Sequence, residues 1–157
     1  MSFKYLIYKG KTVFYCISRY HLFVLKRVYI CSDIDSWVCD FLRSDKSRNL
    51  IKIDFEFTLI HDPSDATGDF VCLLLGFSQI LSKETIDLDK FYVIHESDLP
   101  TGRGWSPVSW QVLNNCDEII VNLIHVVEIV DAGDIVLQDK MLLEGHELID
   151  EIRQEQL

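Results

Sequence analysis

Residues 70–75 read Phe70-Val71-Cys72-Leu73-Leu74-Leu75, an uninterrupted apolar run that ends at Gly76. A run without polar alternation is typical of a strand that is covered on both faces, as in a parallel sheet. Strand-like stretches also occur at Arg27–Cys31, Phe55–Ile60 and Phe91–His95. The run at 70–75 therefore predicts an inner strand of a parallel sheet.

Helical segments alternate with these strands. Asp35 or Ser36 can cap a helix that begins at Trp37, and Ser106-Pro107 has the cap and first-position residues of another, which should run to about Leu113. Further segments are a polar loop at Asp45–Asn49, strands at Ile119–Val127 and Ile135–Leu137, and a last helix opened by Gly145-His146-Glu147. This alternation predicts an α/β fold, a Rossmann-like and mostly parallel sheet.

The composition is that of a globular protein: 157 residues, 48% hydrophobic and 25% charged. The five cysteines are odd in number and form no C-x-x-C pair, which favours reduced thiols and a cytoplasmic protein. No spacing of His, Cys, Asp or Glu suggests a metal site, and no apolar run is long enough to span a membrane.

Charge is unevenly distributed. Residues 1–27 hold six basic residues and no acidic one, so the remainder sets nine basic residues against all 25 acidic ones, a balance of −16. A segment with so large a negative charge would repel the phosphate backbone of a nucleic acid, which disfavours nucleic-acid binding. We expect residues 1–26 to be an extension that precedes the domain at 27–157. A basic arm for a membrane surface or a nucleic acid is the alternative.

Two polar residues are expected at strand ends, where reactive groups gather in open α/β sheets. His95 ends its strand, and Asp131 opens the turn Asp131-Ala132-Gly133-Asp134-Ile135. A histidine oriented by a carboxylate can transfer protons near neutral pH. Both residues also have structural explanations, as a hydrogen-bonding histidine and as a turn aspartate.

Two motifs favour the catalytic interpretation. His95-x-Ser97-x-Leu99-Pro100 followed by Gly104 resembles the H-x-S-L-L-P-x-x-x-G signature of the folate-dependent formyltransferases. Asp131-x-Gly133-Asp134-Ile135-Val136 resembles the second signature of that superfamily, D-x-G-D-[IM]-[LV], and follows in the same order. The resemblance covers about residues 27–156 and is to the N-terminal catalytic domain of methionyl-tRNA and sugar-nucleotide formyltransferases.

The resemblance implies transfer of a formyl group from 10-formyltetrahydrofolate to an amine. It implies that His95 takes a proton from the attacking amine or positions that amine, that Asp131 holds His95 in its useful protonation state, and that Ser97 belongs to the catalytic set. The residues it implies for folate binding are Gly76, Phe77, Ser78, Gln79, Glu128 and Val130.

Val93 stands where most members of the superfamily have an asparagine that stabilises the developing oxyanion. Ser97, a backbone N–H or protonated His95 would have to replace it. Arg103, between two glycines, could contact a phosphate of the acceptor or be a solvated turn residue. Trp105 could stack on the acceptor or pack against the protein.

A small amine acceptor is expected, namely an amino-sugar nucleotide used in surface polysaccharide synthesis. The segment after the first strand lacks the glycines of the purine-synthesis branch. The alternatives are a methionyl-tRNA formyltransferase-like protein, a hydrolase that transfers the formyl group to water, and a truncated remnant without catalysis. Truncation is expected because the last helix, with Leu148, Ile149 and Ile152, stops at Leu157. Whether two copies form a homodimer is left open.

Overall fold

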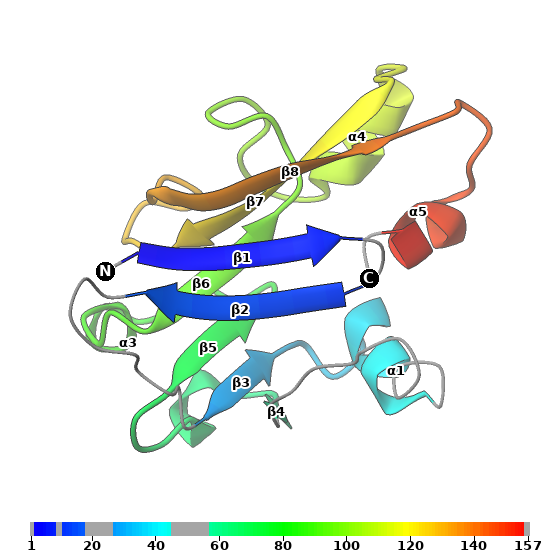
Figure 1. The fold of residues 1–157 in the computed structure, drawn as a ribbon. Coiled ribbons are helices and arrows are strands. Elements are labelled where there is room, and N and C mark those ends of the chain that lie inside the picture. Colours follow the sequence, from blue (N-terminus) through cyan, green and yellow to red (C-terminus); the bar gives the residue numbers. More distant parts are fainter. Residues whose placement is uncertain (1, 9–10, 18–26, 45–56, 156–157) are drawn as a thin grey trace. The chain divides into compact units, whose positions relative to one another are not determined.

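The computed structural model describes residues 2–8, 11–17, 27–44 and 57–155 (Figure 1). The chain divides into two compact units. The first unit is Met1–Val93 and the second is Ile94–Leu157. Strand β6 (Phe91–His95) begins in the first unit and ends in the second. None of the helices in the described ranges is long and apolar enough to cross a membrane.

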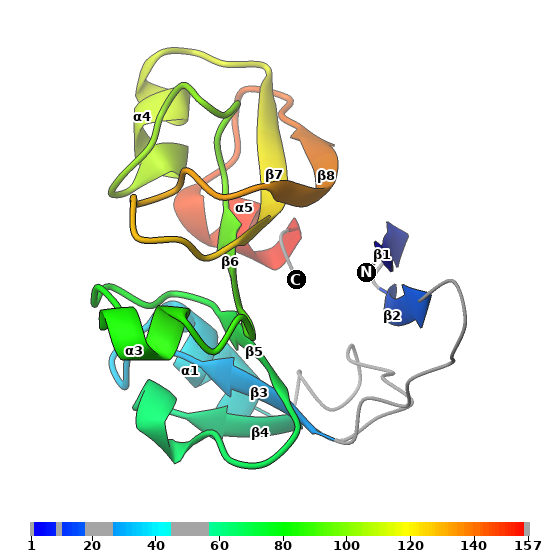
Figure 2. The ribbon, with the colours of Figure 1, turned by 90° about the vertical axis from the view of Figure 1, so that its left-hand side faces the viewer.

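Parallel strands form the centre of the first unit. Strand β3 (Val28–Cys31) lies between β4 (Phe57–Ile60) and β5 (Val71–Leu74), and β5 pairs with the start of β6 (Figure 2). All four residues of β3 are buried, because an inner strand is covered on both faces. The predicted strands at 27–31, 70–75 and 91–95 are thus confirmed to within a residue at each end.

Aromatic rings fill part of the core of this unit. Phe70 meets Tyr29 and Phe91 edge to face, with ring centroids 5.6 and 5.8 Å apart. The ammonium of Lys90 lies 4.6 Å from the centroid of the Phe70 ring and donates to the carbonyl of Gly68. These contacts fix the start of β6, the strand that ends at His95.

Short helices follow the strands of the first unit. Helix α1 (Trp37–Arg43) is capped by Ser36, one of the two caps that the sequence predicts, and the Ser36 hydroxyl accepts the N–H of Cys39 at 3.1 Å. The other elements are the 3-10 helix η1 (Pro63–Asp65) and helix α3 (Lys83–Ile86). The predicted loop at Asp45–Asn49 and the first two residues of the predicted strand Phe55–Ile60 lie outside the described residues.

The N-terminal segment contains strands β1 (Ser2–Tyr8) and β2 (Lys11–Ile17), which pair antiparallel as a separate two-stranded sheet. The charge distribution alone did not predict these strands. The assignment of residues 1–26 as an extension of a domain at 27–157 stays a prediction.

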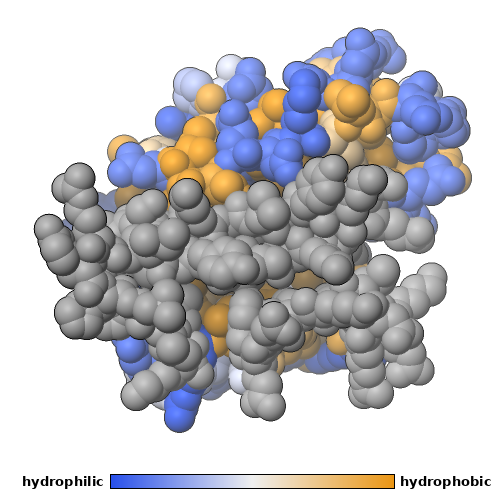
Figure 3. All heavy atoms as spheres, in the orientation of Figure 1, coloured by the Kyte–Doolittle hydropathy of each residue, from blue (hydrophilic) through white to orange (hydrophobic). Residues whose placement is uncertain are grey.

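Two antiparallel strands dominate the second unit. Strand β7 (Glu118–His125) pairs with β8 (Ile135–Leu142), and Asn122 lies directly opposite Gln138. Ile119, Leu123 and Ile124 of β7 are buried, as is Ile152 of helix α5 (Ile149–Glu155). Strand β8 is mostly exposed, and hydrophobic and hydrophilic residues are interspersed on the visible face of this unit (Figure 3).

Element boundaries and one helix cap in the second unit differ from the sequence predictions. Strand β8 extends five residues beyond Leu137, and α5 begins at Ile149, after the Gly145-His146-Glu147 segment. Helix α4 spans Pro107–Leu113 as predicted, but Ser106 is not its side-chain cap. Ser106 has a left-handed backbone, with φ 52°, and its hydroxyl makes no capping hydrogen bond.

Together, β3 to β8 belong to a six-stranded, mostly parallel sheet in the order β4-β3-β5-β6-β7-β8. The described pairings of β3 with β4, β3 with β5 and β5 with β6 are parallel, and that of β7 with β8 is antiparallel. The predicted α/β class with a Rossmann-like sheet is therefore confirmed.

Candidate functional site

His95 is the last residue of β6 and is buried, with 5% of its surface exposed. Its Nδ1 lies 3.5 Å from Oδ2 of Asp131, and its Nε2 lies 3.0 Å from the carbonyl oxygen of Gly102. Both ring nitrogens thus face oxygen acceptors. A doubly protonated ring could donate to both, whereas a neutral ring could donate to only one.

Asp131 follows β7 and has a left-handed backbone, with φ 51°. Its side chain is 11% exposed, and the same Oδ2 that faces His95 accepts the N–H of Gly104 at 2.9 Å. This hydrogen bond from the backbone fixes the direction of the carboxylate. The loop after β6 and the turn after β7 are therefore joined through this one carboxylate oxygen.

The turn that presents Asp131 requires glycine at position 133. A Cβ atom built there would lie 1.7 Å from the carbonyl oxygen of His125, a distance that no side chain tolerates. The N–H of His125 also donates to the carbonyl of Asp134 at 3.0 Å, which closes the turn between β7 and β8. The glycine of the D-x-G-D motif is thus explained by a close approach of two backbone segments.

Ser97 is buried, with 2% of its surface exposed. Within the described part of the chain, its Oγ is the buried side-chain atom that has no hydrogen-bond partner. Its carbonyl oxygen accepts Nδ2 of Asn122 at 2.6 Å. A buried hydroxyl without a partner costs free energy, which makes Ser97 a candidate contact for a bound molecule.

Glu96 is a candidate site residue that the sequence did not indicate. Burial raises the pKa of its carboxyl to about 7, and the negative charge of Asp131 acts in the same direction. Gln111 on α4 donates to its carbonyl oxygen and so holds its backbone. A carboxyl group that titrates near neutrality beside a His–Asp pair is typical of functional sites.

Other predicted site residues lie on the surface. Arg103 and Trp105 are exposed in the segment before α4, where 75% of the surface of Trp105 is accessible. Glu128 and Val130 are exposed residues of the turn before Asp131. Exposed side chains of this kind are available to contact a ligand.

The predicted folate loop, Gly76–Gln79, belongs to the first unit. Asp33 holds it from both sides: its N–H donates to the carbonyl of Gly76 at 3.1 Å, and its carboxylate accepts the N–H of Ser78 at 2.9 Å. Gly76 has φ 56°, a conformation that favours glycine. The prediction that this loop lies near His95 stays a prediction.

Two further observations concern polar groups. Val93 is half-buried and brings no polar side chain to β6 two residues before His95. Within the described ranges, no three His, Cys, Asp or Glu side chains gather as metal ligands.

Comparison with known proteins relates the chain to one family. The family model described as formyl transferase matches residues 53–156, more than half of the chain. Methionyl-tRNA formyltransferase of Clostridium acetobutylicum is 31% identical over 93 residues, which cover 58% of this chain and 30% of that protein. The chain therefore matches less than a third of the length of that curated relative.

Solved structures share the fold. Methionyl-tRNA formyltransferase from Clostridium thermocellum superposes with a TM-score of 0.59 at 22% identity, over 84% of this chain and 66% of that one. The formyltransferase PseJ from Anoxybacillus kamchatkensis, in complex with UDP-4,6-dideoxy-4-formamido-L-AltNAc and tetrahydrofolate, gives 0.56 at 17% identity, over 82% and 67%. At these identities the likeness establishes the fold alone.

Proposed function

The chain belongs to the formyl transferase family, and we propose that it transfers the formyl group of 10-formyltetrahydrofolate to an amine, with His95 and Asp131 as its catalytic pair. The observation that carries the proposal is the placement of the pair. Its two side chains lie 3.5 Å apart, are nearly excluded from water and are fixed by backbone groups of Gly102 and Gly104.

The transfer needs one proton acceptor and one proton donor. The amine nitrogen attacks the formyl carbon and loses a proton, while the bond between that carbon and N10 of the folate breaks and N10 gains a proton. His95 serves both steps, because an imidazole can accept a proton from the amine and return it to the leaving nitrogen. Asp131 faces Nδ1, so its negative charge stabilises the imidazolium formed in between.

The developing oxyanion needs a donor in place of the asparagine that Val93 replaces. We propose Ser97 for this role, because its buried hydroxyl has no partner within the described residues. Protonated His95 could contribute if Nε2 exchanged the carbonyl of Gly102 for the substrate oxygen. Either donor would act in a largely water-excluded environment, where one hydrogen bond to an oxyanion is worth about 3–4 kcal/mol.

We propose that the folate donor contacts the loop Gly76–Gln79 together with Glu128 and Val130, as the resemblance in sequence implies. The described bonds of Asp33 to Gly76 and Ser78 would fix the shape of that loop before the folate binds. No metal is required by this chemistry.

The proposed acceptor is an amino-sugar nucleotide, with the exposed Arg103 on a phosphate and Trp105 on the base or sugar. The balance of −16 outside the first 27 residues favours a small acceptor over a nucleic acid. Methionyl-tRNA is the second candidate acceptor, because methionyl-tRNA formyltransferases are among the curated relatives of the chain.

An acceptor panel tests the proposal. The full chain is incubated with 10-formyltetrahydrofolate and a UDP-linked 4-amino sugar, initiator methionyl-tRNA or buffer alone, and tetrahydrofolate formation is followed. We expect turnover with the amino-sugar nucleotide. Turnover only with the tRNA would establish the second acceptor, turnover in buffer alone would indicate a hydrolase, and no turnover would identify a non-catalytic remnant.

A further inference from the structure

An amide pair lies beside the segment that follows His95. Asn122 on β7 is fully buried, and Gln138 is its direct partner on the antiparallel strand β8. Nε2 of Gln138 donates to Oδ1 of Asn122 at 2.8 Å, and Nδ2 of Asn122 donates to the carbonyl of Ser97 at 2.6 Å. The two amides thus form a chain of hydrogen bonds from β8 to Ser97.

Packing alone does not account for Asn122. Its neighbours Leu123 and Ile124 are buried apolar residues, and a buried amide costs free energy unless its oxygen and nitrogen are both bonded. A primary amide can accept from Gln138 and donate to Ser97 at the same time. An aspartate could not donate when ionised, and an aliphatic residue could do neither.

The bond to Asn122 fixes the Ser97 peptide but leaves the Ser97 hydroxyl without a partner. The side chain of Ser97 lies against Gly102: a Cβ at that glycine would stand 2.9 Å from the Ser97 Cβ and 3.3 Å from its Oγ. The carbonyl of Gly102 in turn faces Nε2 of His95. Ser97 is therefore anchored by Asn122 next to the residue that contacts the catalytic ring.

We propose that Asn122, oriented by Gln138, is a positioning residue that holds the Ser97 peptide so that the Ser97 hydroxyl donates to the formyl oxygen of the folate. The inference rests on the proposed function, and it assigns a task to two residues that no motif includes. Asn122 acts through Ser97 and touches no substrate itself.

The experiment measures how strongly the full chain prefers a formylated folate. The probes are the stable analogue 10-formyl-5,8-dideazafolate and the unformylated 5,8-dideazafolate, with binding followed by tryptophan fluorescence. Because one neutral hydrogen bond contributes about 1 kcal/mol, Ser97→Ala should reduce the ratio of the two affinities roughly five- to ten-fold. Asn122→Val should reduce that ratio similarly, and the double variant should lose no more than either single one.

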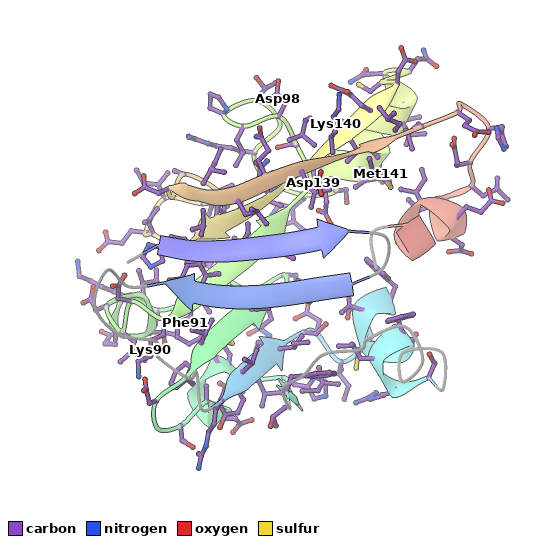
Figure 4. All side chains as sticks on the ribbon, viewed as in Figure 1. Lys90, Phe91, Asp98, Asp139, Lys140 and Met141 are labelled. Carbon is purple, nitrogen blue, oxygen red and sulfur yellow. The ribbon has the colours of Figure 1, made fainter. Side chains whose placement is uncertain are left out.

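If Asn122→Val fails to fold, Gln138→Met takes its place in the test. Gln138 is exposed, so its replacement should leave the protein folded. It removes the donor to Asn122 and should reduce the ratio two- to three-fold. Lys140→Met is the matched control, since it changes an exposed residue of the same strand that bonds Glu118 instead, and it should leave the ratio unchanged (Figure 4).

The results separate the inference from the proposed function. Equal weakening of both folates in Asn122→Val and Gln138→Met would show a general structural role and overturn the inference. A wild-type chain that binds both folates equally would also overturn it, while leaving folate binding intact. A wild-type chain that binds neither folate would overturn the proposed function, and the inference with it.

Discussion

Replacing Glu96 by glutamine should remove a pH-dependent loss of stability. Burial raises the pKa of this carboxyl from its ordinary 4.5 to about 7, with Asp131 adding to the shift. The folded protein therefore holds the Glu96 proton more tightly than the unfolded chain does. This contribution to stability is fully present below pH 4.5 and is lost as the pH rises to about 7, where the carboxyl ionises in the folded state.

The size of the effect follows from the two pKa values. A shift of 2.5 pKa units, from 4.5 to about 7, corresponds to roughly 3.4 kcal/mol at about 1.36 kcal/mol per unit. By the linkage relation, roughly 2.5 kcal/mol of this change in the unfolding free energy occurs between pH 5 and pH 8. Because Glu96 remains partly accessible to solvent, we expect about 2 kcal/mol.

Urea denaturation of wild type and Glu96→Gln at pH 5, 6, 7 and 8 measures this difference. As the pH rises from 5 to 8, the unfolding free energy of the variant should increase by about 2 kcal/mol relative to that of wild type. Asp98→Asn is the matched control, because Asp98 is an exposed carboxylate on the loop after β6 (Figure 4). The reasoning would be refuted if the difference in unfolding free energy between wild type and Glu96→Gln stayed constant from pH 5 to pH 8.

Three further predictions concern other parts of the chain. Gly133→Ala should destabilise the protein by about 3 kcal/mol or more in urea denaturation, because the new methyl group would overlap the His125 carbonyl, whereas Ala132→Ser on the same turn should cost less than about 1 kcal/mol. Deletion of residues 1–24 should change the unfolding free energy by less than about 1 kcal/mol, and a collapse of the melting temperature would show that β1 and β2 are integral. Val93→Asn should raise kcat, by up to about 100-fold, because it adds an oxyanion donor to the one proposed at Ser97, and an unchanged kcat would show that the position of Val93 does not reach the oxyanion.

The apolar segments were the predictable part of the fold. Strands β3 and β5 are buried runs whose hydrophobicity marks them in the sequence, and α1 begins after a serine that caps it. The length of strand β8 was underestimated because the part that follows Leu137 begins with Gln138, Asp139 and Lys140, which are exposed and give no apolar signal. An apolar pattern in the sequence identifies a buried strand, whereas the extent of an exposed strand depends on the neighbouring strand with which it pairs.

The candidate site shows the same division. His95 and Asp131 were predicted from motifs, and the structure brings their side chains within 3.5 Å. Asn122 and Gln138 could not be predicted, because their contact depends on the register of β7 against β8, which the sequence does not state. Glu96 was missed because the shift of its pKa arises from burial, a property of the folded chain.

The central claim is that the His95–Asp131 pair moves the proton during formyl transfer. Its most direct test is the single-turnover rate of tetrahydrofolate formation from 10-formyltetrahydrofolate, measured with the acceptor that supports turnover, for wild type, His95→Ala and Asp131→Asn. We predict a loss of about 10²–10⁴-fold in His95→Ala and a severe loss in Asp131→Asn, with folate affinity retained in both. An undiminished rate in His95→Ala would contradict the mechanism.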